Sequence, residues 1–389
     1  MSDARAALTR YARWMLDEAL PFWASTGVDG AQGFVEALEL DGSPRRTGFK
    51  RVRVHARQVY VFSHAHLLGV PGALAAANNG AEFLLRHGWG PQGGWVVKMG
   101  ESGGHVDTEL DLYDQAFVLL AMAWWHRASG DPRALEAAQR TLDKIDADFA
   151  RPDGRGYLSR LPDRGEALQN PHMHLLEALL AHYPLASTPA NARRIEALRR
   201  HFSAHLLDAE TGTLGEYFAM DWTPEPGPRG DTVEPGHHYE WVWLLGLAER
   251  LGFGAAAPEA ERLFAFAEAH GLTETGLIHD ELARDGTQRS ARHRSWPQTE
   301  RLKALALRGE ESGAPDLDAI ATALTALMDH YLAPAPPGTW IDHVDATGAP
   351  CVDKIPASTL YHLFLAYAEL TRVAPALFGD DFKPVDLVP

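Results

Sequence analysis

The chain has 389 residues, of which 46% are hydrophobic, and its formal net charge is −16. This acidic balance would repel phosphate backbones and anionic membranes, and no apolar run reaches the roughly 18 residues of a membrane span, so we expect no nucleic-acid and no membrane partner. The single cysteine, Cys351, excludes an intrachain disulfide, and the charged first segment does not resemble a signal peptide, so we expect a cytoplasmic protein.

In chain order, a basic cluster comes first, at residues 45–57. The sequence allows two interpretations of this cluster: a solvated strand and turn, or a site for a phosphate or sulfonate group. Six segments then predict helices with an apolar stripe at a spacing of 3.6 residues. They are ARQVYVFSHAHLLG (56–69), TELDLYDQAFVLLAMAWWHRASG (108–130), NPHMHLLEALLAHYP (170–184), PGHHYEWVWLLGLAERLG (235–252), SWPQTERLKALALRG (295–309) and ASTLYHLFLAYAEL (357–370).

One residue near each helix start reveals a repeat. The steps between successive members are 56, 61, 63, 59 and 66 residues, for the series Arg57, Tyr113, His174, His237, Trp296 and His362. Ordinary amphipathic helices alternate with these six; one of them has Asp131 as a predicted N-cap and Pro132 at its first position. Each ordinary helix is followed by a Gly-marked extended piece, such as GFVEALELDGS or LGEYFAMDWTP, which predicts a small hairpin or extended loop.

The repeated unit is therefore an ordinary helix, an extended loop and a second helix with polar residues at its start. One unit cannot bury its own apolar face, so six units must stack, and six helical pairs can close into a ring. We predict an all-α fold, an (α/α)6 barrel with short β-hairpins or extended loops at one rim, forming a single domain over residues 1–389. The starts of all six inner helices would then share that rim and converge on one pocket, where six helix dipoles favour an electron-rich ligand.

The candidate site residues lie in those first turns. Asn170 and His174 share one helix face, as do His237 and Glu240, because residues three or four apart are neighbours on a helix. Glu240 could orient the imidazole of His237 or contact a ligand hydroxyl, whereas His238 points elsewhere and is expected to be structural. The whole set is Arg57, Tyr113, Asn170, His174, His237, Glu240, Trp296 and His362.

Several kinds of site are disfavoured by the motifs. The two His-x-His pairs, His64/His66 and His172/His174, face opposite sides of a helix, and no His-Glu-x-x-His occurs, so we expect no catalytic metal. Phosphate-binding loops and a nucleophile elbow are absent, and we expect no cofactor. Two separated imidazoles, an arginine, carboxylates and aromatic faces instead favour proton transfer on a monosaccharide, with Arg57 stabilising an enediol.

With these residues in view, the sequence resembles the N-acylglucosamine 2-epimerase superfamily, in the motifs ARQVYVFSHA, NPHMHLLEA, PGHHYEW, WPQTERLKA and IPASTLYHLFLA. The resemblance spans nearly the whole chain and implies an (α/α)6 barrel. It implies that His237 and His362 are catalytic and that Arg57, Tyr113, Asn170, His174, Glu240 and Trp296 bind the sugar. The implied mechanism opens the pyranose ring and removes the C2 proton to give a cis-enediol; which histidine does which is left open.

The ASTLYH motif resembles mannose-type isomerases, so we favour aldose–ketose isomerisation of D-mannose or a close hexose analogue to D-fructose. The alternative is 2-epimerisation of N-acylglucosamine or a free hexose. A barrel-type glycoside hydrolase would need a carboxylate pair, for which Asp114 and Glu300 are weaker partners of Glu240, and a non-catalytic sugar-binding module would exchange no C2 proton. The oligomeric state is left open.

Overall fold

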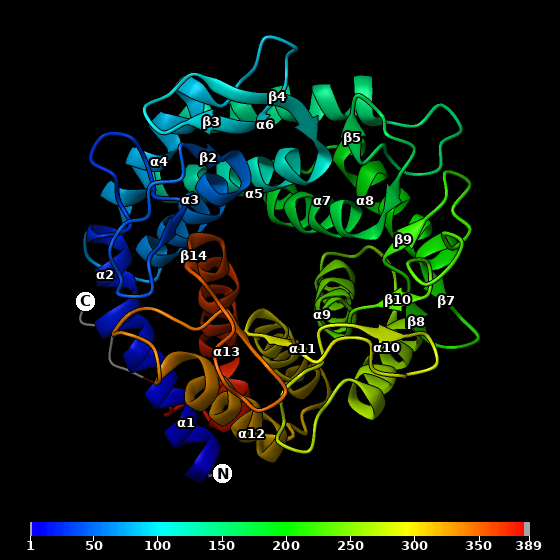
Figure 1. The fold of residues 1–389 in the computed structure, drawn as a ribbon. Helices are drawn as coiled ribbons and strands as arrows, with labels where there is room; N and C mark the ends of the chain where they lie inside the picture. The colour runs from blue at the N-terminus through cyan, green and yellow to red at the C-terminus, as the bar shows by residue number, and fades with distance from the viewer. Residues whose placement is uncertain (1, 385–389) are drawn as a thin grey trace.

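A computed structural model describes residues 2–384 and consists of two concentric layers of helices (Figure 1). The inner layer is a ring of helices that surround the barrel axis: α3 (Val52–Leu67), α5 (Leu112–Ser129), α7 (Gln169–His182), α9 (Pro235–Arg250), α11 (Trp296–Ser312) and α13 (Leu360–Phe378). The outer layer consists of α1 (Ser2–Arg13), α2 (Leu20–Ser25), α4 (Ala73–His87), α6 (Pro132–Lys144), α8 (Pro189–His201), α10 (Ala257–His270) and α12 (Leu317–Leu327). The predicted (α/α)6 barrel is confirmed.

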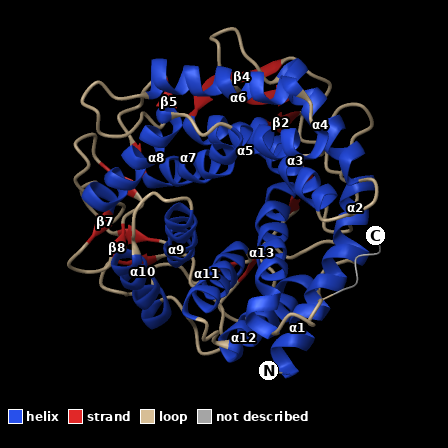
Figure 2. Cartoon of the chain, turned by 180° about the vertical axis from the view of Figure 1, so that it is seen from behind, coloured by secondary structure: helices blue, strands red, loops and turns tan. Residues whose placement is uncertain are grey.

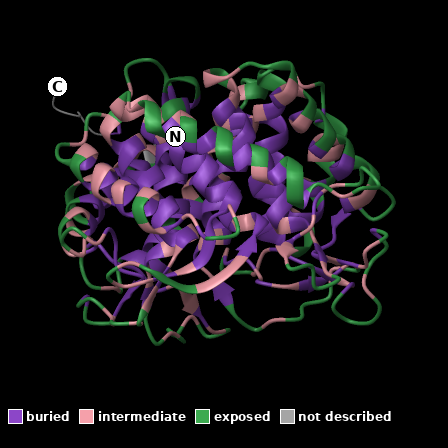
Figure 3. Cartoon of the chain, turned by 90° about the horizontal axis from the view of Figure 1, so that it is seen from above, coloured by how far each residue is buried: buried purple, intermediate pink, exposed green. Residues whose placement is uncertain are grey.

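The two layers differ in sequence because they differ in surroundings. An inner helix such as α9 is buried on all sides from Pro235 to Gly246, including the polar residues of its first turns, whereas α6 keeps a charged face in solvent and buries an alanine-rich stripe. The predicted cap of α6 is confirmed, since the Asp131 side chain accepts a hydrogen bond from the backbone N–H of Arg133. Figure 3 shows the result: buried helices form the body and exposed positions lie on its outside.

Four outer helices end in a π-helical turn before the chain enters its loop. These turns are η1 (Trp14–Ala19), between α1 and α2, η2 (Ile145–Phe149), η4 (Phe202–Leu206) and η5 (Met328–Leu332). Two 3-10 turns complete the helical elements, η3 (Tyr183–Leu185) after α7 and η6 (Ala357–Thr359) before α13.

Short strands gather at one end of the barrel, on the side where the inner helices begin (Figures 1 and 3). They are β1 (Ala37–Leu38), β2 (Phe49–Arg51), β3 (Val96–Gly100), β4 (His105–Asp111), β5 (Arg160–Leu161), β6 (Ala167–Leu168), β7 (Leu207–Asp208), β8 (Thr213–Leu214), β9 (Tyr217–Phe218), β10 (Thr232–Val233), β11 (Leu282–Ala283), β12 (His293–Arg294), β13 (His343–Val344) and β14 (Ile355–Pro356). The predicted rim is therefore present.

The pairing of these strands differs from the predicted local hairpins. Only β3–β4 and β7–β8 pair with a sequence neighbour from the same loop, whereas the antiparallel pairs β2–β3, β4–β5, β6–β9, β10–β11, β12–β13 and β14–β1 join one unit to the next. The loops do fold back through single bridges, such as Leu38 with Pro44. The strand before each inner helix thus pairs with the following unit, and β14–β1 joins the last unit to the first. Among the described residues, six separate small sheets form this collar around the rim.

Buried side chains tie this collar to the inner helices at a recurring position. The fourth residue of α3, α7 and α9 is a histidine whose Nε2 accepts a backbone N–H from a loop: His55 from Phe34, His172 from Tyr157 and His238 from Leu214. In α5 the same place is taken by Gln115, which accepts from Trp95 N–H. The structural role predicted for His238 is confirmed, and it satisfies a backbone donor that would otherwise be buried without a partner.

One hydrophobic cluster extends from Ala4 in α1 to Phe378 in α13 and involves every unit. The single domain over residues 1–389 stays a prediction, since residues 1 and 385–389 lie outside the described part of the chain. Among residues 2–384, every helix is too short or too polar to cross a membrane. Figure 2, which views the barrel from behind, shows the opposite end of the inner ring, where the inner helices finish.

Candidate active site

All eight predicted site residues line one cavity of about 300 Å³ inside the rim. They come from six different helices, because each inner helix contributes side chains from its first turns. Six residues that the sequence interpretation did not select complete the lining: Glu234, Arg294, Asp342, His343, Ser358 and Thr359. The prediction that the inner helix starts converge on one pocket is confirmed.

His237 is held between two carboxylates. Its Nδ1 hydrogen-bonds to Glu216 Oε1 at 2.9 Å and lies 3.9 Å from Glu234 Oε2, while its Nε2 lies 3.3 Å from the Asn170 amide. Burial disfavours the charged ring, but the attraction of Glu216 and Glu234 outweighs it and raises the pKa of His237 to about 9. His237 is therefore an imidazolium at neutral pH, with Nε2 on the side away from Glu216.

His362 has the opposite electrostatic surroundings. Its Nδ1 hydrogen-bonds to Glu300 Oε1 at 2.8 Å, and the other oxygen of Glu300 lies 2.5 Å from the ammonium of Lys303. Burial, followed by the charges of Arg57 and Lys303, holds the pKa of His362 well below its usual value. In the neutral ring of His362, Nδ1–H donates a hydrogen bond to Glu300. The lone pair of Nε2 is then free to act as a base.

The indole of Trp296 lies between the two imidazoles. Its ring centroid is 5.0 Å from that of His237 and 5.4 Å from that of His362. The two histidines therefore face one space, from α9 and from α13, with an aromatic surface alongside on which the C–H face of a sugar can pack.

Glu240 does not play the orienting role that its spacing suggested. His237 Nδ1 donates its hydrogen bond to Glu216, and Glu240 adds only a weaker electrostatic attraction to the charged ring. Both carboxyl oxygens of Glu240 are buried without a hydrogen-bond partner among the described residues, and His174 Nδ1 is 3.9 Å away. Burial and the nearby charge of Glu300 raise the pKa of Glu240 well above its usual value, so its charged form is disfavoured. Contact with a ligand hydroxyl stays a prediction.

Arg57 and Tyr113 line the other side of the cavity. The Arg57 guanidinium donates a hydrogen bond to the Tyr113 hydroxyl and lies over the rings of Phe117 and Tyr361, at 4.2 and 5.0 Å. Among residues 2–384 it has no carboxylate within 4.0 Å. Arg57 thus keeps an unneutralised charge that can stabilise a developing oxyanion.

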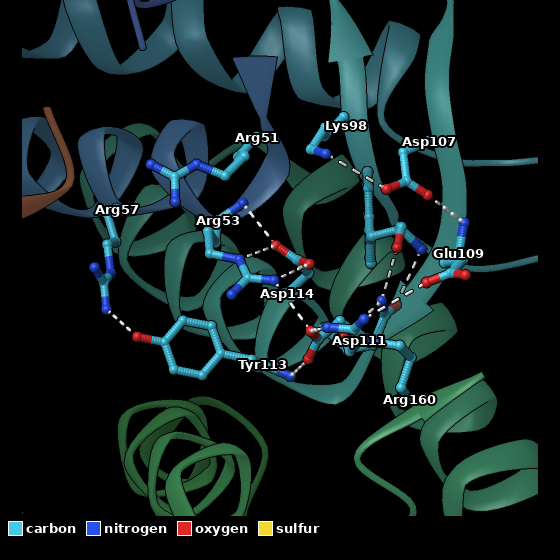
Figure 4. Close-up of polar contacts among 12 residues, drawn as sticks. Arg51, Arg53, Arg57, Lys98, Asp107, Glu109, Asp111, Tyr113, Asp114 and Arg160 are labelled. Atoms are coloured by element: carbon cyan, nitrogen blue, oxygen red, sulfur yellow. Dashed lines mark hydrogen bonds and ion pairs between the residues drawn. The ribbon is translucent and has the colours of Figure 1, made fainter. Parts of the chain in front are cut away.

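The rest of the basic cluster is neutralised. Figure 4 shows Arg53 directed at Asp114 and Asp111, with its guanidinium 2.8 and 3.1 Å from them, and Arg57 directed away from them toward Tyr113. Arg51 pairs with Glu36, and Arg45 with Asp353. Lys50 and Arg46 both pair with Asp29. Asp114 is therefore paired with Arg53 and does not line the cavity, so it cannot serve as the second carboxylate that a glycoside hydrolase would need.

Among residues 2–384, three groups of side chains have ligand atoms within 4.8 Å of one another, a spacing that could accommodate a metal ion. They are His174/Glu177/Glu240, Glu216/Glu234/His237 and Glu240/Glu300/His362. In each group the imidazole Nδ1 already hydrogen-bonds to a carboxylate of the group, at 2.8 to 2.9 Å. A metal would have to displace these bonds and, in the third group, compete with Lys303. Independence from metal stays a prediction.

Sequence reasoning missed Glu216 because it lies on the loop between β8 and β9, outside any helical spacing. A usable signal existed: an acidic residue recurs in four of the extended pieces, at Glu36, Glu216, Asp280 and Asp342. Three of these carboxylates accept hydrogen bonds from the segment that enters the next inner helix, as Glu36 does from Arg51 N–H. Glu216 instead binds Gln169 and His237.

The fold and site together define an (α/α)6-barrel enzyme with a buried acid–base cavity of monosaccharide size. The chain belongs to the N-acylglucosamine 2-epimerase family, whose model matches residues 33–366. It is 36% identical to a mannose-6-phosphate isomerase of Rhizobium meliloti, over 92% of this chain and 95% of that one, and 29% identical to a D-mannose isomerase of Thermobifida fusca, over 96% of each. A solved cellobiose 2-epimerase from Bacillus thermoamylovorans shares the fold, with a TM-score of 0.83 and 20% identity over 93% of this chain and 98% of that one. The chain is therefore a sugar isomerase or epimerase.

Proposed function

We propose that the protein is an aldose–ketose isomerase that interconverts D-mannose and D-fructose, with His237 and His362 as its acid and base. The observation that carries the proposal is the opposite polarisation of two imidazoles that face one cavity. Two carboxylates keep His237 protonated, whereas burial and the charges of Arg57 and Lys303 keep His362 neutral. Titratable groups whose surroundings push their pKa values apart are typical of an acid–base pair.

The reaction then follows from these protonation states. In ring opening, His362 takes the proton of the anomeric hydroxyl while His237 gives a proton to the ring oxygen. After the two histidines regain their starting states, His362 removes the C2 proton and His237 protonates O1, which gives the cis-enediol. Return of the proton from His362 to C1, with loss of the O2 proton to His237, gives the ketose. Arg57 stabilises the negative charge that develops on the oxygens.

The charges around the cavity favour an unphosphorylated sugar, although one relative is named for a phosphorylated substrate. Arg294, the second guanidinium of the lining, is already paired with Glu234 at 2.6 Å and with Asp280 at 3.2 Å. His343 is paired with Asp342 at 3.0 Å. A phosphate dianion would therefore meet carboxylates and only one unneutralised arginine, Arg57, which the enediol requires.

A 2-epimerase is the second candidate, because the same geometry permits it. Epimerisation needs a proton returned to the opposite face of C2, and the cavity offers two imidazoles from different helices, each next to Trp296. If O1 stayed an enediolate oxygen stabilised by Arg57, His237 would keep its proton and could deliver it to the opposite face of C2, which would regenerate the aldehyde and give the C2 epimer. A hydrolase is not supported: Glu300 is occupied by Lys303 and His362, so Glu240 lacks an unpaired partner.

The test is incubation of the chelator-treated protein with D-mannose in deuterated water, followed by NMR of the products. Fructose labelled with deuterium at C1 supports the isomerase, and glucose labelled at C2 as the main product supports the epimerase. A parallel reaction with mannose 6-phosphate tests the charge argument; faster turnover of that sugar than of mannose contradicts it. Absence of any exchange at C2 would refute both enzymatic functions.

A further inference from the structure

A second cavity, of about 500 Å³, lies at the opposite end of the barrel axis from the active site. It opens among the last turns of the inner helices, at the end of the ring that faces the viewer in Figure 2. Five inner helices contribute to it, α3, α5, α7, α9 and α13, and most of its wall is apolar or aromatic, as at Trp124, Leu180 and Leu247. We call it the lower cavity.

The lower cavity is separated from the active site by one layer of buried side chains. Glu177 belongs to that layer: it lines the lower cavity, and its carboxylate binds His174 Nδ1 at 2.9 Å and the Tyr361 hydroxyl. His174 in turn lines the active-site cavity. A molecule in the lower cavity would thus lie one side chain away from the catalytic space.

One cation in the wall of the lower cavity lacks a counter-ion. Arg127 stacks over the Trp124 ring at 4.8 Å and donates a hydrogen bond to the Ala181 carbonyl, but within the described chain no carboxylate lies within 4.0 Å of it. The two other arginines there are neutralised, since Arg250 and Arg372 both pair with Glu310, at 2.6 and 3.0 Å. Arg127 is therefore the residue of the wall with which a bound anion would have the strongest electrostatic attraction.

Exposed leucines lie at and beside the mouth of the lower cavity, together with the exposed arginines Arg250 and Arg372. Leu251, at its edge, is 37% exposed, and Leu67, next to the lining residue Leu68, is 46% exposed. These are two of four large hydrophobic side chains that are exposed among the described residues. A volume of about 500 Å³ is within the roughly 300–1,000 Å³ of small-molecule sites. The wall presents few hydrogen-bonding groups, so a sugar would lose its hydration there without replacement.

We propose that the lower cavity binds an amphipathic monocarboxylate, whose aliphatic or aromatic body packs on Trp124, Leu180 and Leu247 and whose carboxylate pairs with Arg127. No residue lines both cavities, so binding at this site can be tested without reference to the proposed sugar chemistry. The ligand class combines the two features of the wall: an extended apolar surface and a single unneutralised guanidinium.

The test is calorimetric titration of the full-length protein with octanoate, with binding as the readout and no dependence on turnover. We expect saturable binding by the wild type. Arg127→Gln should weaken it about tenfold, as loss of a charged hydrogen bond does. Ala181→Trp, at a half-buried position of the wall, should abolish binding by filling the cavity. Hexanoate should bind about fifteenfold more weakly than octanoate, because it has two fewer methylenes and each buried methylene is worth about fourfold in affinity.

The matched control is Arg140→Gln, because Arg140 also stacks on a tryptophan, Trp89, at 4.0 Å, but lies outside the cavity. Octanoate should bind this variant like the wild type. Absence of saturable octanoate binding to the wild type would overturn the proposal, as would equal affinities in the wild type, Arg127→Gln and Ala181→Trp. If Ala181→Trp instead dissociated a wild-type dimer in sedimentation experiments, a second copy of the chain would be the occupant and the proposal would be wrong.

Discussion

Replacing Glu216 by glutamine should lower the pH above which the enzyme loses activity. The rise in the pKa of His237 from 6.5 to about 9 corresponds to about 3 kcal/mol of preference for the imidazolium, since a tenfold change is worth about 1.4 kcal/mol. At an effective dielectric constant of about 20, Coulomb's law gives about 6 kcal/mol for Glu216 at 2.9 Å and about 4 kcal/mol for Glu234 at 3.9 Å. Of the two carboxylates, Glu216 therefore contributes more to the preference of His237 for the imidazolium, which persists although burial opposes it.

The assay is kcat/KM for mannose isomerisation between pH 5 and pH 10. In the wild type the acid, His237, is lost as the pH rises through about 9, so activity should fall there. In Glu216→Gln the alkaline midpoint should drop by about two pH units or more, so that activity at pH 8 falls at least about tenfold while much of it survives near pH 6. Glutamine keeps the size of the side chain and can still accept from the Gln169 amide, which now binds Glu216 at 2.9 Å.

The control is Glu196→Gln, which removes an exposed carboxylate on α8 that lies 3.8 Å from Arg200, and whose profile should match the wild type. An alkaline midpoint that stays near 9 in Glu216→Gln would show that Glu216 does not keep His237 protonated. The same linkage predicts that the stability contributed by protonated His237 is present at pH values below 6.5 and is lost as the pH rises through about 9.

Three further predictions test other parts of the site. His362→Asn should lower kcat by about a thousandfold because the base is lost, while mannose still binds in a calorimetric titration; near-normal turnover would remove His362 from the mechanism. Lys303→Met should destabilise the protein by about 3–5 kcal/mol in urea unfolding, since it leaves the buried carboxylate of Glu300 without its cation, and this loss should shrink at low pH, where Glu300 protonates. His238→Ala should cost about 1–3 kcal/mol of stability, because the Leu214 N–H loses its acceptor, with kcat nearly unchanged; a large fall in kcat without loss of stability would contradict its structural role.

The parts of the site that sequence predicted are those carried by helices. A recurring helix start has a fixed geometry, so the spacing from Arg57 to His362 was enough to place eight side chains in one cavity. The repeat also fixed the count of six units, because the steps between its members are nearly equal. Helical periodicity was thus sufficient to predict both the fold and the residues that line the site.

The parts that sequence did not predict depend on contacts between units. Glu216 reaches His237 from a loop, and Glu300 reaches His362 from α11, so neither partnership follows from spacing within one helix. The strands were expected to close on themselves, yet they pair across unit boundaries, since a register between distant segments is set by packing of the helices beneath them. Glu240 and His237 share a helix face, but a third residue takes the hydrogen bond that proximity suggested.

The β14–β1 pairing has a consequence for how the protein is made. Ile355 and Pro356 pair with residues near the start of the chain, and α13 packs between α11 and α3. A ribosome that has completed five units has therefore produced an open crescent, with the apolar flanks of α3 and α11 uncovered and the proposed base, His362, not yet synthesised. Partial chains should be both inactive and prone to associate, and maturation should depend on late, long-range docking of the last unit.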